Sequence, residues 1–214
     1  MTFLLEHAPA LSIGIPLLFA FLVPLVGKVN GKVRNAFVVL GMLLTAAIVL
    51  PLAANVIAGS PQVYVMGAES PGLTLPGGMN VPVRIVLEID ALSAMMAGLA
   101  VTVSFLALVY SFCFMKGSGL GKFYSLFFVM LAGLLGLLFT GDMFTLFVFF
   151  EVLSISSVAL VAFWHKRAGS VEAAFKYLVV SAVASLFLLF AVGLLYGNYG
   201  VLNIAALSGA LRFS

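Results

Sequence analysis

The apolar span that begins at residue 141 holds one carboxylate well inside it: Gly141-Asp142-Met143-Phe144-Thr145-Leu146-Phe147-Val148-Phe149-Phe150-Glu151-Val152-Leu153-Ser154. As a helix, the stretch from Met143 to Trp164 is long enough to cross a bilayer, at about 1.5 Å per residue. Glu151 then lies roughly 12 Å from the Asp142 end, close to the midplane. A charge at that depth costs about 2.5 to 3.5 kcal/mol on insertion scales, so such residues usually have a partner and a function. The sequence therefore predicts a functional role for Glu151.

The composition is that of an integral membrane protein. Of 214 residues, 64% are hydrophobic and 8% are charged, and the mean hydropathy is +1.28. These values exclude an ordinary soluble domain and make the lipid bilayer an expected partner. The formal net charge of +3 consequently gives no reason to expect nucleic-acid binding. Glu6 and His7 stand where a signal peptide would carry positive charge, so we expect no removable signal.

Six membrane-spanning helices are predicted, which makes the fold class all-α and polytopic. The apolar segments cover about residues 11–26, 35–58, 91–115, 123–140, 143–164 and 171–196. The expected organisation is two helices within residues 1–58, a non-cytoplasmic loop over 59–90, four helices within 91–196 and a C-terminal stub over 197–214. The loop is rich in proline and glycine and has room for a hairpin. Asp90 at its end is predicted to cap the third helix.

The basic residues alternate between connections. The first, third and fifth connections hold three, two and two Lys or Arg residues, whereas the fourth holds only Asp142. In the second connection, Arg84 is offset by Glu69, Glu88 and Asp90. By the positive-inside rule, the chain is expected in the inner or plasma membrane with both termini outside the cytoplasm.

Small residues four positions apart mark two helices for close packing. They are Ala94, Gly98 and Thr102 on the third helix, and Ala132, Gly136 and Thr140 on the fourth. Such stripes let helix backbones approach each other in a membrane. We interpret both stripes as packing surfaces.

A few other ionisable groups lie in or beside the spans. Lys176 lies early on the sixth helix, and Glu172 precedes it by four residues, the spacing of a local surface ion pair. The alternative is that Lys176 joins Glu151 in ion translocation. His165 is a candidate proton carrier at the cytoplasmic end, although beside two basic residues it fits an anchor at the inner surface better.

Hydroxyl groups provide a candidate polar path. Tyr177, Ser181 and Ser185 are spaced four residues apart on the sixth helix, and Ser154 shares the face of Glu151. Such groups can order water between helices. More often they bond across helices or back to a carbonyl oxygen.

The stretch from Gly141 to Ser154 resembles the fifth-helix signature of the antiporter-like subunits. This family is shared by Mrp-type cation/proton antiporters, membrane-bound hydrogenases and respiratory complex I, an NADH dehydrogenase, and the chain is most similar to the D subunit of Mrp antiporters. Glu172-Ala173-Ala174-Phe175-Lys176-Tyr177-Leu178 and Gly193-Leu194-Leu195-Tyr196-Gly197 resemble its sixth helix, and Ile89-Asp90-Ala91-Leu92-Ser93 resembles the start of its third. The similarities follow the family's order along nearly the whole chain.

The resemblance implies that Glu151 is the family's essential fifth-helix glutamate, which interacts with a lysine on a seventh helix. Thr145 departs from the asparagine expected there. Family members have about fourteen helices in two inverted repeats, whereas this sequence covers six. We therefore expect either the N-terminal portion of a split subunit of this kind or a shortened paralogue, and in both cases a seventh-helix lysine supplied by a partner membrane subunit.

The expected function is that of a membrane subunit in a cation/proton antiporter or an Mrp-related respiratory complex, moving H⁺ or Na⁺ with partner subunits. One alternative is a purely structural scaffold, and another is half of an unrelated secondary transporter with its site at a dimer interface. The sequence has no nucleotide-binding loop, metal-ligand cluster or nucleophile paired with a base. We therefore expect no catalytic site, metal or cofactor in this chain, and assign any oxidoreductase chemistry to partner subunits.

Overall fold

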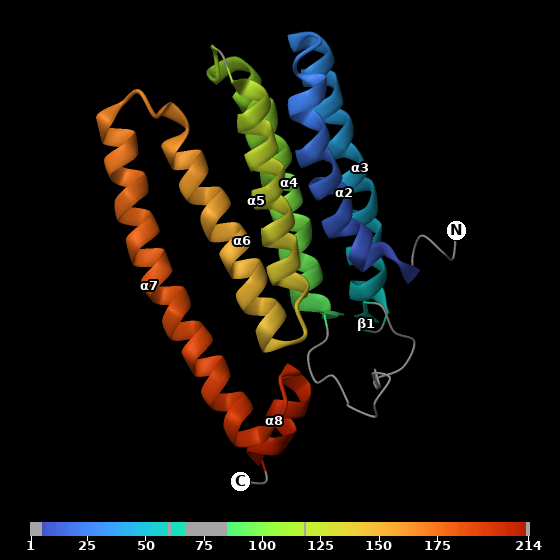
Figure 1. The fold of residues 1–214 in the computed structure, drawn as a ribbon. Coiled ribbons are helices and arrows are strands. Elements are labelled where there is room, and N and C mark those ends of the chain that lie inside the picture. The colour runs from blue at the N-terminus through green and yellow to red at the C-terminus, as the bar shows by residue number, and fades with distance from the viewer. Residues whose placement is uncertain (1–5, 60, 67–84, 118, 213–214) are drawn as a thin grey trace, which may run out of the picture.

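A computed structural model of the chain describes residues 6–59, 61–66, 85–117 and 119–212. Within these residues, six helices are long and apolar enough to cross a membrane (Figure 1). These six are α2 (Ala8–Val26), α3 (Gly31–Ala58), α4 (Ala91–Phe114), α5 (Leu120–Phe139), α6 (Met143–Val161) and α7 (Ala168–Tyr199). A further short helix, α8 (Ile204–Arg212), follows them. A 3₁₀ turn, η1 (Ala162–Trp164), follows α6. The prediction of an all-α polytopic membrane protein is confirmed.

Several helix ends lie about three or four residues from the predicted ones, including the starts of α2, α3, α5 and α7 and the end of α7. α2 starts at Ala8 because Pro9 occupies its first turn, where the missing amide of proline costs nothing. α7 continues through Gly197 and stops at Tyr199, three residues later than expected. A single glycine costs a helix only about 1 kcal/mol. Gly200 ends α7 because it adopts the left-handed conformation, with φ of 67°, and donates its amide to the Tyr196 carbonyl.

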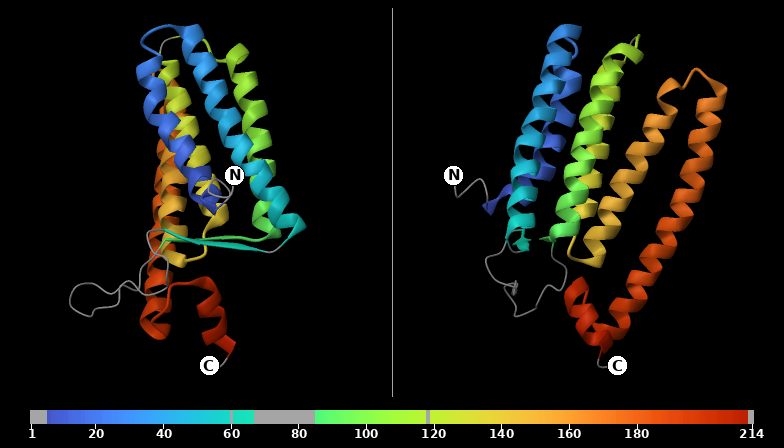
Figure 2. Two further views of the ribbon diagram at one scale, coloured as in Figure 1. Left: turned by 90° about the vertical axis from the view of Figure 1, so that its right-hand side faces the viewer. Right: turned by 180° about the vertical axis from the view of Figure 1, so that it is seen from behind.

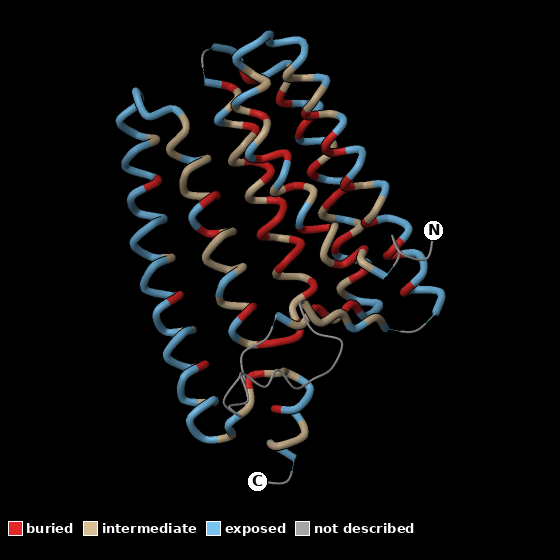
Figure 3. Tube along the Cα trace, turned by 45° about the vertical axis from the view of Figure 1, so that its right-hand side comes forward, coloured by how far each residue is buried: buried red, intermediate tan, exposed pale blue. Residues whose placement is uncertain are grey.

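The buried core lies on the N-terminal side of the bundle. Helix α5 packs against α2 on one side and α6 on the other, and its Tyr124, Phe128 and Phe139 are among the largest fully buried side chains. Figure 3 shows buried positions gathered in α2 to α5 and very few along α7. Helix α7 contacts α6 and η1 and otherwise presents an apolar surface to its surroundings.

A two-stranded ribbon crosses one end of the bundle (Figure 2). Strands β1 (Gln62–Val65) and β2 (Val86–Ile89) pair antiparallel, so residues 59–90 do contain paired strands. Arg84 and Glu69 lie outside the described residues. The α2–α3, α4–α5 and α6–α7 connections lie together at the opposite end of the bundle, which therefore carries most of the basic side chains.

The predicted packing role of the small-residue stripes holds on α5 and only in part on α4, where Ala94 is buried but Thr102 is not. On α5, Gly136 lies directly against the Phe149 ring of α6. On α4 the buried face contains Ala94, Ala97 and Val101, and Thr102 is exposed. Residues four apart turn by about 400°, so a strict four-residue stripe drifts off a packing face that alternates three and four.

Candidate functional site

Glu151 lies close to the middle of α6, in a groove between α5 and α6. The groove encloses about 400 Å³ and has an almost wholly apolar lining, including Val129 of α5 and Phe147 and Ile155 of α6. The Glu151 side chain is half-buried there. Within the described part of the chain no hydrogen bond or ion pair to its carboxylate occurs. Among the described residues, Glu151 is therefore a carboxyl group without a partner, at the depth where a membrane would exclude water.

Asp142 fixes the start of the helix that carries Glu151. One carboxylate oxygen accepts the Thr145 amide at 2.7 Å, which caps α6, and the other accepts the Val86 amide of β2 at 3.1 Å. Asp142 is only 3% exposed. By sequence, Asp142 is predicted only to be the acid of the fourth connection. An Asp three residues before Thr145 at a helix start is an N-cap pattern that could have revealed the first contact.

The segment around Asp142 is also held from below. The Gly141 amide donates to the Val86 carbonyl at 2.8 Å, and the Met143 amide donates to the Leu202 carbonyl at 2.9 Å. A Cβ at Gly141 would lie 3.2 Å from the Cβ of Glu88. The start of α6 is thus tied both to β2 and to the segment before α8.

The hydroxyl groups are only partly brought together. The Ser154 hydroxyl on α6 is hydrogen-bonded to the Ser181 hydroxyl on α7. Ser185 also faces α6, but its hydroxyl donates to the Ala182 carbonyl of its own helix at 3.0 Å. Tyr177 does not join them and is 43% exposed.

Lys176 and Glu172 form the local ion pair that their spacing predicts. The Lys176 Nζ lies 2.5 Å from a Glu172 carboxylate oxygen, and the two side chains are 73% and 66% exposed. On α7, Lys176 precedes Ser181 by five residues and so lies nearer the basic end of the bundle. On α6, Glu151 precedes Ser154 by three residues and so lies farther from that end. The two ionisable groups are thus offset by roughly 12 Å along the helix axes.

His165 lies at the basic end of the bundle, in the turn between η1 and α7. It is exposed, and its Nδ1 is 3.4 Å from the Phe163 carbonyl oxygen. Together with Lys122, Lys166 and Arg167 it lines a pocket of about 700 Å³. His165 therefore lies among the basic side chains at this end of the bundle, away from Glu151.

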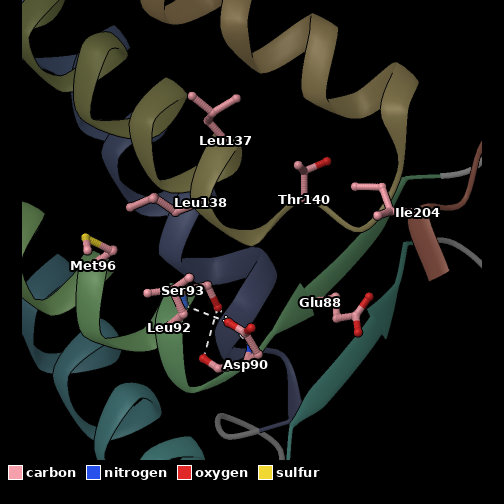
Figure 4. Close-up of a pocket in the computed structure, with 9 residues that line it drawn as sticks. All are labelled: Glu88, Asp90, Leu92, Ser93, Met96, Leu137, Leu138, Thr140 and Ile204. Carbon is pink, nitrogen blue, oxygen red and sulfur yellow. Dashed lines mark hydrogen bonds between the residues drawn. The ribbon is translucent and has the colours of Figure 1, made fainter. Parts of the chain in front are cut away.

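A second pocket, of about 460 Å³, lies at the opposite end of the bundle between β2, α4, α5 and α8. Figure 4 shows Glu88 and Asp90 among its lining residues. Asp90 caps α4 as predicted, because it accepts the Ser93 amide at 2.7 Å while the Ser93 hydroxyl receives the Asp90 amide at 2.9 Å. The hydrogen bond from the Ser93 amide, followed by that from its side chain, holds the pKa of Asp90 below its usual range. No group of three His, Cys, Asp or Glu side chains suited to a metal ion occurs in the described residues.

The chain matches two family models. Residues 140–214 match the family described as NADH:quinone oxidoreductase/Mrp antiporter, TM. Residues 76–128 match NADH-Ubiquinone oxidoreductase (complex I), chain 5 N-terminus. The chain belongs to the antiporter-like subunit family. It corresponds to the N-terminal portion of the family's members, which confirms the resemblance seen in the sequence.

Similar proteins include subunits of NADH-quinone oxidoreductases and subunits of cation/proton antiporters. NADH-quinone oxidoreductase subunit N of Desulforudis audaxviator is 36% identical over 209 residues, which cover 94% of this chain and 39% of that protein. The D subunit of the Na(+)/H(+) antiporter of Alkalihalophilus pseudofirmus is 32% identical over 178 residues, covering 83% of this chain and 33% of that protein. The chain thus spans well under half the length of these relatives.

Two solved structures have the same fold. A chain of the membrane-bound sulfane sulfur reductase, an archaeal respiratory membrane complex, superposes with a TM-score of 0.83 at 33% identity over 94% of this chain and 39% of that one. A chain of respiratory complex I from Thermus thermophilus superposes with a TM-score of 0.67 at 23% identity over 90% of this chain and 38% of that one. The second likeness concerns the fold alone.

Proposed function

We propose that this chain is an ion-translocating membrane subunit that works with other membrane subunits, and that Glu151 takes up and releases a proton as H⁺ or Na⁺ moves. The observation that carries the proposal is the position of Glu151, halfway along α6 in an apolar groove and without a partner in the described residues. Relatives of this chain are named as subunits of NADH-quinone oxidoreductases and of cation/proton antiporters. This supports ion translocation over an unrelated transporter.

A charged Glu151 requires a cation. An ionised carboxylate in hydrocarbon is costly unless it is paired or hydrated. The family resemblance assigns that role to a lysine on a seventh helix, which would reach the α5–α6 groove from outside residues 1–214. When the cation approaches, the carboxyl group of Glu151 loses its proton and becomes a carboxylate, and when the cation withdraws, the proton returns.

A polar path from Glu151 towards the basic end is part of the same proposal. The Ser154 and Ser181 hydroxyl pair would be its first step. Lys176, roughly 12 Å from Glu151 along the helix axes, and its ion-pair partner Glu172 would be its next charged groups. The remaining polar groups proposed for this path are Tyr177, Ser185 and His165.

The proposed membrane is the inner or plasma membrane. Lys28 and Arg167 lie in connections at one end of the bundle, and Lys32 and Lys122 lie in the first turns of α3 and α5 at the same end. By the positive-inside rule this end faces the cytoplasm, and both termini lie on the other side.

The test is Glu151→Gln in the assembled complex, with ion movement measured in sealed vesicles and assembly measured on the same sample. Glu88→Gln is the matched control, because it makes the same chemical change outside the membrane spans. We expect Glu151→Gln to lose translocation with assembly intact, and Glu88→Gln to retain it. Unchanged translocation in Glu151→Gln would favour the scaffold alternative. Cross-linking of the chain to an identical copy across the groove would favour half of a secondary transporter.

A further inference from the structure

The pocket at the basic end of the bundle is a strongly cationic cavity. It lies between the α4–α5 connection and the η1–α7 turn and encloses about 700 Å³. Lys122, His165, Lys166 and Arg167 line it. No Asp or Glu is found among the described residues of its lining. The cavity therefore has three basic side chains, besides His165, and no acidic one in the described part of its wall.

Two helix N-termini add to this positive potential. α5 begins after Gly119 and α7 begins after Arg167, and both residues line the pocket. Neither helix receives a hydrogen bond from a capping side chain. The two helices are 20 and 32 residues long. Their first amides thus lack side-chain acceptors, and the partial positive charges of both helix ends point to the same region. Such ends bind phosphate groups well.

The inner part of the pocket is apolar. Leu126, Ala159, Ala162 and Phe163 line it. Leu126 also lines the groove that contains Glu151, so the basic pocket lies next to the apolar groove between α5 and α6. An anion alone would gain nothing from this second half. A molecule with a charged head and a hydrocarbon tail would use both.

Trp164 and Arg167 give the pocket the character of a membrane interface. The Arg167 guanidinium lies 5.7 Å from the centre of the Trp164 ring, which restrains its position. Tryptophan is enriched at the level of lipid headgroups. The planar guanidinium of arginine suits phosphate oxygens, which it can bind through two parallel hydrogen bonds.

We propose that this pocket binds one anionic phospholipid. Its phosphodiester lies between Lys122 and Arg167 at the two helix N-termini, and one acyl chain lies on Leu126 and Ala159 at the mouth of the groove. Basic pockets between membrane helices are known to hold acidic headgroups. The proposal does not depend on the role of Glu151.

The single tryptophan of the chain provides the test, because Trp164 stands in the pocket wall. The purified 214-residue chain is placed in bilayers containing either brominated phosphatidylglycerol or brominated phosphatidylcholine, and quenching of Trp164 fluorescence gives the relative affinity. The pocket variant is the double substitution K122Q/R167Q. The control is K28Q/K32Q, which removes two charges from the α2–α3 connection and the first turn of α3 at the same end. Circular dichroism verifies that both variants keep the helical content of the wild type.

We expect the wild type and K28Q/K32Q to prefer phosphatidylglycerol roughly tenfold or more, and K122Q/R167Q to lose that preference. Inorganic phosphate at millimolar concentration should leave the preference in place, because a free anion lacks the acyl contact. Equal quenching by both lipids in the wild type would overturn the proposal. So would an equal loss of preference in both variants, which would mean that only the overall surface charge attracts the lipid.

Discussion

The Ser154 hydroxyl of α6 and the Ser181 hydroxyl of α7 are hydrogen-bonded to each other. This contact sets the register of the two antiparallel helices and places the exposed Glu172–Lys176 pair on the basic side of Glu151. It also connects α7 to the bundle, because few other positions of α7 are buried.

Removing either hydroxyl should weaken the attachment of α7. Hydrogen bonds between membrane helices contribute about 0.6 kcal/mol on average and up to about 1.7. We expect Ser154→Ala and Ser181→Ala to lower the free energy of unfolding by similar amounts in this range. The double variant should cost less than the sum of the two, as measured by reversible unfolding in mixed micelles. Additive effects would mean that the two hydroxyls do not interact.

Asp142 should be the most sensitive acidic residue for stability. Asp142→Ala leaves the Thr145 and Val86 amides without their acceptor in a buried place, at a cost of about 1 to 3 kcal/mol. Asp90→Ala removes an exposed cap and should cost about 1 kcal/mol. Thermal unfolding in detergent compares the two. A smaller loss for Asp142→Ala than for Asp90→Ala would contradict this ranking.

Gly133 should not accept a side chain. A Cβ there would lie 2.9 Å from the Leu153 amide nitrogen and 3.1 Å from its Cα, which are backbone atoms of α6 and cannot move alone. We expect Gly133→Ala to separate α5 from α6 and to destabilise the chain by about 1 to 3 kcal/mol. Gly193→Ala on α7 is the control. Nothing lies within 4 Å of that added Cβ, so alanine should stabilise the helix by up to about 1 kcal/mol.

Asp90 should make the start of α4 sensitive to acid. Its pKa is lowered in the folded chain by the hydrogen bond from the Ser93 amide. The stabilisation is therefore complete above the ordinary aspartate pKa of about 3.9 and is lost as the pH falls through the lowered value. Asp90→Asn keeps a capping oxygen but does not titrate in this range. In melts from neutral to acidic pH, the wild type should lose more stability than Asp90→Asn below about pH 4.

The sequence predicted the six helices because each is a long apolar run, and it predicted the cap of α4 because Asp90 precedes such a run. It identified Glu151 because a carboxylate inside an apolar span stands out in one dimension. The Glu172–Lys176 pair was also readable, since both partners lie on one helix.

Contacts between segments far apart in the chain could not be predicted from the sequence. The Asp142 contact with Val86 spans 56 residues and depends on how β2 meets the α5–α6 turn. Tyr177 was grouped with Ser181 by spacing alone, yet which part of α7 faces α6 depends on tertiary packing. The convergence of Lys122 with Arg167 in one pocket likewise joins two separate connections of the bundle.

The central claim, that Glu151 changes its protonation during ion translocation, is tested most directly by infrared difference spectroscopy. Spectra of the assembled complex in vesicles are recorded at rest and during turnover, for the wild type, Glu151→Gln and Glu88→Gln. We predict a band of a protonated carboxyl group that changes during turnover in the wild type and in Glu88→Gln and is missing from Glu151→Gln. A complex that translocates ions without any band that depends on Glu151 would contradict the claim.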